Sequence, residues 1–222
     1  GGNGPLTEYA TLREYLNSNV KKILWIYYEG NDLGNLKNEL KNNILINYLK
    51  DLIFSQDLKL KQNEIDELAV REIDENLKKD ETITEEQKQI IIKYRIRKFI
   101  KIYNIRSLIL KPAIPTNNIS SKPVPEFKKI LQLTKELVNQ NNSELYFVYL
   151  PEYSRFKKHH DNTNYNFVKN IVKELDINFI DINKEVFEKQ ENPLILFPFK
   201  LDGHYTVEGY KKVSEAIFNL TR

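Results

Sequence analysis

Apolar runs along the chain predict the strands of a sheet. Residues 22–28 read Lys-Ile-Leu-Trp-Ile-Tyr-Tyr, and residues 144–150 read Glu-Leu-Tyr-Phe-Val-Tyr-Leu. Runs of this kind are apolar on both faces, which is typical of strands in a parallel sheet that helices cover on both sides. A further run over residues 177–182 is weaker and alternates more between apolar and polar positions.

Helical spacing of apolar residues surrounds these runs. It predicts helices over residues 5–16, 125–140, 165–175 and 206–220. The last of these carries a single apolar stripe, formed by Val207, Tyr210, Val213, Ile217 and Leu220. The alternation of strands with helices predicts a three-layer α/β domain built on a parallel sheet.

Between residues 36 and 111 the pattern is helical only. The spacing predicts helices over residues 36–54, 62–77 and 84–110, and the last of them opens with the capping box Thr-Glu-Glu-Gln. We therefore predict an α/β domain made of residues 1–35 and 112–222, together with a helical insertion over residues 36–111. Our hypothesis for the insertion is a lid or one wall of a pocket.

The charged residues of the insertion are sorted by sign. Acidic side chains crowd residues 57–86, whereas the charged side chains of residues 88–111 are all basic. Because the two segments are adjacent in sequence, we interpret them as facing arms of an antiparallel helical hairpin. The alternative interpretation is a basic amphipathic helix that lies on a membrane or a polyanion.

The composition narrows the class of protein. Lys+Arg 34 against Asp+Glu 31 gives a formal net charge of +3, which is too balanced to indicate a nucleic-acid partner. Cys 0 excludes disulfides, thiolate metal sites and cysteine nucleophiles. Met is also absent and the chain starts at Gly1, so we expect the natural N-terminus, with any targeting segment or membrane anchor, to precede it. The compartment stays open between the cytoplasm and a membrane-anchored or periplasmic location.

Short polar segments fall where parallel sheets bind ligands, outside the carboxyl ends of the strands. Residues 30–32 read Gly-Asn-Asp, and the Asn31 amide there can donate to a substrate oxygen. Residues 202–204 read Asp-Gly-His, which places a carboxylate near a candidate general base. Residues 1–5 read Gly-Gly-Asn-Gly-Pro, and backbone N–H groups at such a helix start can bind an anion. Each segment alone is more typical of a turn.

The remaining histidines are adjacent, at positions 159 and 160, in a polar loop. No partner carboxylate or cysteine stands at ligand spacing from His159 or His160. We therefore interpret both side chains as solvated and predict no metal site.

Taken together and in this order, three sequence blocks resemble the SGNH/GDSL hydrolase family. They read Gly-Gly-Asn-Gly-Pro, then Trp-Ile-Tyr-Tyr-Glu-Gly-Asn-Asp-Leu, then Asp-Gly-His-Tyr-Thr-Val-Glu-Gly-Tyr, and they span nearly the whole chain apart from the helical insertion. The resemblance implies a flavodoxin-like SGNH fold and hydrolysis of an ester or related acyl bond. It implies an oxyanion hole formed by the backbone N–H of Gly2 and the side chain of Asn31. It also implies that His204 is the general base and Asp202 its orienting carboxylate. No cofactor is expected.

The chain departs from the family pattern in two places. The nucleophile block Gly-Asp-Ser is absent, and the family places this block before the oxyanion glycine. We therefore expect the nucleophilic serine and the first strand to lie upstream of Gly1, and the chain alone to be inactive. Ser154, which follows the second apolar run, is interpreted as a loop residue. The family spacing is Asp-x-x-His, whereas one residue separates Asp202 from His204.

The resulting hypothesis is an SGNH-type hydrolase that acts on a small-molecule or carbohydrate acyl ester. The alternatives are a polysaccharide O-acyltransferase with the same site, and a non-catalytic binding module with a degenerate pocket. We expect no nucleic-acid partner. Membrane contact is expected only through an N-terminal segment outside the chain or through the basic helix over residues 88–111.

Overall fold

The computed structural model of the chain describes residues 3–81 and 124–222. Gly2 and the basic helix predicted over residues 88–111 therefore lie outside the described residues. The chain divides into two compact units, one formed by residues 1–56 and 120–222 and the other by residues 57–119. The sequence pattern had suggested boundaries after residues 35 and 111 instead.

A parallel sheet lies at the centre of the first unit. Among the described residues it has three strands in the order β1 (Lys22–Tyr28), β2 (Glu144–Leu150) and β3 (Asn178–Asp181). The strands predicted from the apolar runs are thus confirmed, and so is their parallel direction. β3 is shorter than the predicted 177–182 at both ends, and at its carboxyl end the backbone of Ile182 is already helical, at the start of η2 (Asn183–Phe187).

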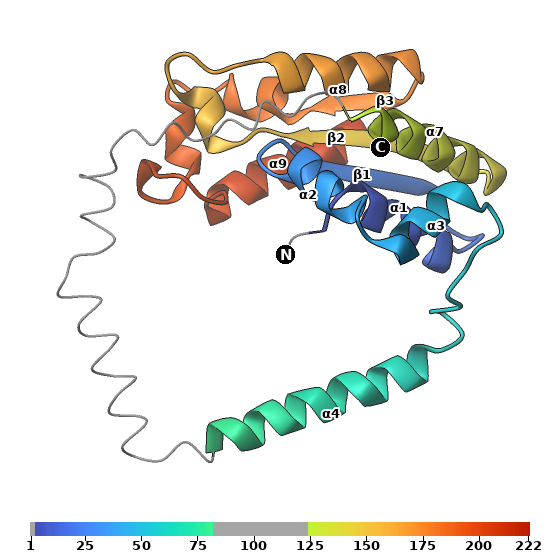
Figure 1. Cartoon of the computed structure of the whole chain (residues 1–222). Helices are drawn as coiled ribbons and strands as arrows, with labels where there is room; N and C mark the ends of the chain where they lie inside the picture. The colour runs from blue at the N-terminus through green and yellow to red at the C-terminus, as the bar shows by residue number, and fades with distance from the viewer. Residues whose placement is uncertain (1–2, 82–123) are drawn as a thin grey trace. The chain divides into compact units, whose positions relative to one another are not determined.

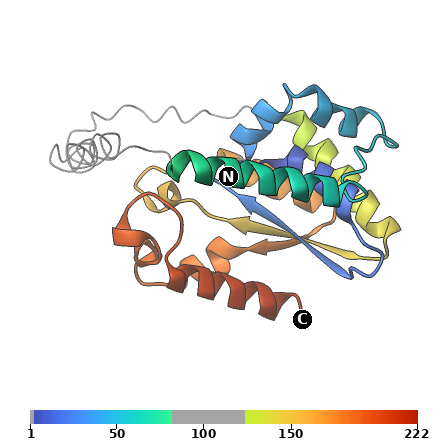
Figure 2. The same cartoon turned by 90° about the horizontal axis from the view of Figure 1, so that it is seen from below.

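Helices cover both faces of this sheet (Figures 1 and 2). α1 (Pro5–Tyr15), α7 (Pro125–Gln140) and α8 (Thr163–Glu174) lie on one face, and α9 (Val207–Leu220) lies on the other. Strand side chains alternate between the two layers. Trp25, Tyr27, Phe147 and Tyr149 join the core under α1, α7 and α8, whereas Tyr146, Val148 and Ile180 join the core under α9. The first unit is therefore a mixed α/β domain, as predicted.

Aromatic side chains hold α7 on the sheet. Tyr27, Phe127 and Phe147 are almost completely buried, and the Tyr27 ring centroid lies 5.8 Å from that of Phe127 and 5.5 Å from that of Phe147. Full burial of one such side chain stabilises a fold by about 1.5–3 kcal/mol. This packing places α7 on the face of the sheet that carries Tyr27 and Phe147.

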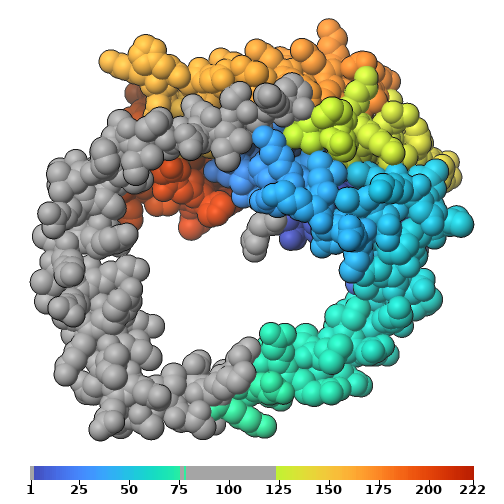
Figure 3. Space-filling view, in the orientation of Figure 1, coloured from blue at the N-terminus to red at the C-terminus, as the bar shows by residue number. Residues whose placement is uncertain are grey.

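Residues 36–56 belong to the first unit. The single helix predicted over 36–54 is two helices, α2 (Asp32–Glu39) and α3 (Asn43–Lys50). Asn42 separates them, because its side chain caps α3 by accepting the backbone N–H of Ile44 at 2.9 Å. Leu36 and Tyr48 are fully buried in the core that α1 and α7 share. Figure 3 shows this helical face, where α2 and α3, in blue, adjoin α7, in yellow-green.

The described part of the second unit contains one long helix, α4 (Gln62–Glu81). It begins where the spacing predicts and continues past the predicted end at residue 77 to Glu81, the last described residue of this stretch. In the stretches that the structure describes, no helix is both long and apolar enough to span a bilayer. Short 3-10 helices in the first unit complete the elements: η1 (Tyr153–Phe156), η3 (Pro193–Leu196) and η4 (Pro198–Lys200).

Candidate active site

The loops that follow β1 and β2 lie side by side at the carboxyl edge of the sheet. Tyr28 is paired with Leu150 at the ends of these strands, and the backbone N–H of Glu29 donates to the Leu150 carbonyl at 3.0 Å. The turn over residues 29–32 therefore faces the segment 151–155. Open parallel sheets bind their ligands at this edge.

Asn31 occupies the N-cap position of α2 but does not cap the helix with its side chain. Instead, the Asp32 carboxylate closes the turn by accepting the backbone N–H of Tyr28 at 2.7 Å. The Asn31 side chain is exposed, and within the described residues its amide has no hydrogen-bond partner. The amide is therefore available to a ligand, as an oxyanion donor must be.

Because residue 30 is a glycine, the backbone of the turn can lie close to the side chains of Tyr28 and Glu152. A Cβ atom at this position would lie 2.5 Å from Cε1 of Tyr28 and 3.2 Å from Oε2 of Glu152. The first distance is shorter than any real contact of a Cβ atom, so a larger residue would displace either the Tyr28 ring or the backbone that carries Asn31. A glycine is required here by close approach rather than by its backbone angles.

His204 reaches the same edge from the other end of the chain. It lies in the exposed loop between η4 and α9, and its ring centroid is 6.1 Å from that of Tyr28, with the rings inclined at 43°. Burial, followed by the carboxylates of Glu152 and Asp202, raises the pKa of Tyr28 to about 12. The structure thus brings His204 next to the turn that carries Asn31.

The pairing of Asp202 with His204 is absent from the described structure. Both side chains are exposed, and no hydrogen bond or ion pair between described residues joins them. No hydrogen bond between described residues joins Ser154 to His204 either, and the Ser154 hydroxyl donates to Oε1 of Glu152. Gly2, the other expected oxyanion donor, lies outside the described residues.

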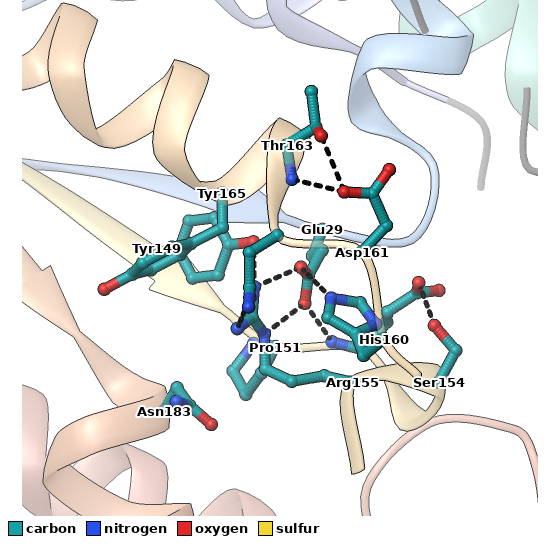
Figure 4. Close-up of polar contacts among 12 residues, drawn as sticks. Glu29, Tyr149, Pro151, Ser154, Arg155, His160, Asp161, Thr163, Tyr165 and Asn183 are labelled. Carbon is teal, nitrogen blue, oxygen red and sulfur yellow. Dashed lines mark hydrogen bonds and ion pairs between the residues drawn. The ribbon is translucent and has the colours of Figure 1, made fainter. Parts of the chain in front are cut away.

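A buried charged cluster behind the turn was missed by the sequence analysis. Glu29, Arg155 and His160 converge at the carboxyl edge, with side chains that are 4%, 8% and 13% exposed (Figure 4). The interpretation of His160 as solvated is therefore wrong, since its Nε2 lies 3.4 Å from Oε1 of Glu29. His159 is exposed, as expected. The signal in the sequence was a carboxylate directly after an apolar strand, because a charge that is buried there requires a partner.

Carboxyl groups also gather at the start of α1. Glu39 accepts the backbone N–H groups of Gly4 at 2.7 Å, Leu6 at 3.0 Å and Thr7 at 3.3 Å, and so caps this helix from α2. Burial and the carboxylates of Asp32 and Glu39 raise the pKa of Glu8 from 4.5 to about 8. Burial, together with Glu39, raises the pKa of Asp32 to about 7 despite its hydrogen bond from Tyr28.

The raised pKa of Glu8 predicts that the protein loses stability as the pH rises. The folded state keeps a proton on Glu8 between about pH 4.5 and 8 that the unfolded state releases, so the free energy of unfolding falls across this window. We expect Glu8→Gln to raise the free energy of unfolding at pH 8 by about 1–3 kcal/mol and to change it little at pH 4.5. Urea denaturation at pH 4.5, 6 and 8 measures this.

The exposed Glu215 supplies the matched control, because Glu215→Gln makes the same substitution on the surface of α9. It should leave the pH dependence of the wild type in place. Asp32 also loses a proton in this range, so Glu8→Gln reduces the slope without abolishing it. Equal slopes for Glu8→Gln and the wild type would show that Glu8 is ionised in the folded protein.

Comparison of the chain with protein-family models, with curated proteins and with solved structures finds no match. Among the described residues no three His, Asp or Glu side chains are grouped as metal ligands would be. The class that the fold defines is an α/β protein with a parallel sheet and polar groups gathered at the carboxyl edge.

Proposed function

We propose that this chain is the greater part of an SGNH-type acyl-ester hydrolase whose nucleophilic serine lies upstream of Gly1. One observation carries the proposal. His204 lies against the ring of Tyr28, the last residue of β1, and Asn31, with an amide that has no partner among the described residues, follows three residues later in the turn at the same carboxyl edge. An amide donor and an imidazole at one ligand-binding edge suit acyl transfer, in which an oxyanion and a mobile proton appear together.

The unpaired outer edge of β1 is a second observation in favour of the proposal, because a further strand could pair with it. Among the described residues β1 pairs only with β2, and Leu24 and Ile26 remain 41% and 40% exposed. A cavity of about 460 Å³ runs along this edge between β1 and α1, and its lining is mostly apolar. Unpaired edges of hydrophobic strands are usually paired or covered in native proteins. A strand that paired here would end next to Asn31, where a nucleophile is needed.

The proposed reaction is a double displacement. The serine oxygen attacks the ester carbonyl carbon while His204 takes the serine proton, and the carbonyl oxygen becomes an oxyanion that Asn31 and the backbone N–H of Gly2 stabilise. The carbonyl re-forms, the alcohol leaves, and the alcohol takes the proton from His204. Water then repeats the sequence on the acyl-serine and releases the acid. The orienting role of Asp202 rests on the family resemblance alone.

Ester hydrolysis by the intact protein, which includes the sequence before Gly1, tests this function. We expect the intact protein to release p-nitrophenol from p-nitrophenyl acetate, and the chain of residues 1–222 to do so no faster than a heat-denatured control. Product analysis with an added sugar then separates the two acyl-transfer reactions. Free acid as the product supports the hydrolase, whereas an acylated sugar would identify an O-acyltransferase with the same site.

A further inference from the structure

Glu29 is the first residue after β1, and its side chain turns inward at the carboxyl edge (Figure 4). Its backbone N–H extends the pairing of β1 with β2 by donating to Leu150 at 3.0 Å. Its carboxylate is 4% exposed. A charge at this depth is costly to bury unless other groups of the protein neutralise it.

The carboxylate of Glu29 is occupied by donors from the loop after β2. Nε of Arg155 donates to Oε2 at 2.8 Å, and Nη2 of Arg155 donates to Oε1, so the contact has two points. The backbone N–H of Glu152 donates to Oε2 at 3.1 Å. Nε2 of His160 lies 3.4 Å from Oε1 but has no hydrogen-bond partner among the described residues. Both oxygens of Glu29 are therefore engaged within the protein.

Arg155 is held as firmly as its partner. Nη1 donates to Oδ1 of Asn162 at 3.0 Å, and Nη2 also donates to the hydroxyl of Tyr149 at 3.2 Å. The guanidinium lies 4.6 Å from the ring centroid of Tyr165. Because neither charge of the pair is turned toward solvent, neither one is placed to touch a substrate. The pair can influence a reaction only through the position of other groups.

Asn31 lies two residues after Glu29 in the same turn. The turn that carries Asn31 is held on one side by the Arg155 ion pair and on the other by the hydrogen bond from Tyr28 N–H to Asp32 at 2.7 Å. We propose that Glu29, Arg155 and His160, here called the Glu29 cluster, are positioning residues that fix the Asn31 amide at the carboxyl edge.

An ion pair suits this task better than an apolar contact does. A buried ion pair contributes little net stability compared with apolar side chains of the same volume. However, the two-point contact of a guanidinium with a carboxylate permits only one relative orientation. Lysine cannot make that contact, because its ammonium is a single point charge. Arg155→Lys therefore keeps the positive charge and removes the two-point contact with the Glu29 carboxylate.

The effect of the Glu29 cluster on the position of the Asn31 amide can be measured by NMR without an activity assay. In the ¹⁵N-labelled chain, the side-chain amide of Asn31 is identified as the pair of signals that Asn31→Asp removes. We expect Arg155→Lys and Glu29→Gln to broaden these signals or move them by more than a linewidth. Lys128→Gln, which removes the exposed Lys128–Glu174 ion pair, should leave them unchanged. Unchanged Asn31 signals in a folded Arg155→Lys or Glu29→Gln protein would overturn the proposal.

A third variant keeps the test decisive if both substitutions prevent folding. His160→Gln removes the 3.4 Å contact with Glu29 but leaves the two-point ion pair in place. It should fold and give a smaller change of the Asn31 signals. Wild-type signals in this variant, together with failure of the other two to fold, would show that the cluster only stabilises the fold.

The effect on rate rests on the proposed function and is measured separately in the intact protein. We expect Arg155→Lys to lower kcat about tenfold to hundredfold and to leave KM within about twofold, because a small misplacement of a transition-state donor reduces kcat. If Asn31→Ala does not lower kcat, the proposed function fails, whatever the NMR shows. If Asn31→Ala lowers kcat but Arg155→Lys does not, only the positioning role fails.

Discussion

Replacement of His204 by alanine is expected to lower kcat for ester hydrolysis by the intact protein about 10³- to 10⁴-fold. The proposed reaction needs His204 to accept a proton from the nucleophile and return it to the leaving alcohol, and general acid–base groups contribute about 10²- to 10⁴-fold to such steps. KM should change little, because the loop that carries His204 is exposed and its removal creates no cavity. Steady-state kinetics with p-nitrophenyl acetate measures both constants.

His159→Ala is the matched control for this prediction. His159 is also exposed and lies in the loop between η1 and α8, and no hydrogen bond, ion pair or ring contact between described residues joins it to the turn that carries Asn31. We expect its kcat to equal that of the wild type. Loss of activity in both variants would indicate a general effect on folding, and full activity of His204→Ala would remove His204 from the mechanism.

Replacement of Asn31 by alanine is expected to lower kcat about 10²- to 10³-fold, which corresponds to about 2.7–4 kcal/mol of transition-state stabilisation. The amide has no partner within the described structure, so its loss leaves no other group unsatisfied and should not unfold α2. Asn31→Asp should be slower still, because a carboxylate would repel the oxyanion. The same kinetic assay, with circular dichroism to verify folding, measures the change.

Asn38→Ala is the appropriate control, since Asn38 is exposed on the same helix and belongs to no proposed site. Its kcat should remain within about twofold of the wild type, as surface substitutions usually have small effects. A kcat for Asn31→Ala that matches the Asn38→Ala value would mean that the amide stabilises no oxyanion.

The strands of the sheet could be predicted from local sequence because their burial leaves a simple pattern. Residues 144–150 are apolar on both faces and helices cover both. Residues 22–28 are also apolar, but only the face of Trp25 and Tyr27 is buried, and Leu24 and Ile26 on the other face are exposed. Helix ends were less predictable. The break between α2 and α3 depends on Asn42, whose capping hydrogen bond competes with a continuous helix across 36–54.

Some residues of the candidate site could likewise be predicted from the sequence, and others could not. Asn31 and His204 were predicted from the resemblance of their motifs to the SGNH/GDSL family, and in the structure His204 lies against Tyr28, which directly precedes the turn after β1. The Glu29 cluster was not predicted, because Glu29 and Arg155 are 126 positions apart and meet only through the pairing of β1 with β2. Contacts across a sheet leave no periodic pattern in the sequence.

Labelling with a fluorophosphonate probe tests the central proposal most directly, because the probe forms a covalent bond only with an activated serine. Mass spectrometry of the labelled intact protein should locate the probe on a serine upstream of Gly1. The chain of residues 1–222 and the intact His204→Ala variant should remain unlabelled. A label on Ser154 or another serine within residues 1–222, or an intact protein that takes up no label, would contradict the account.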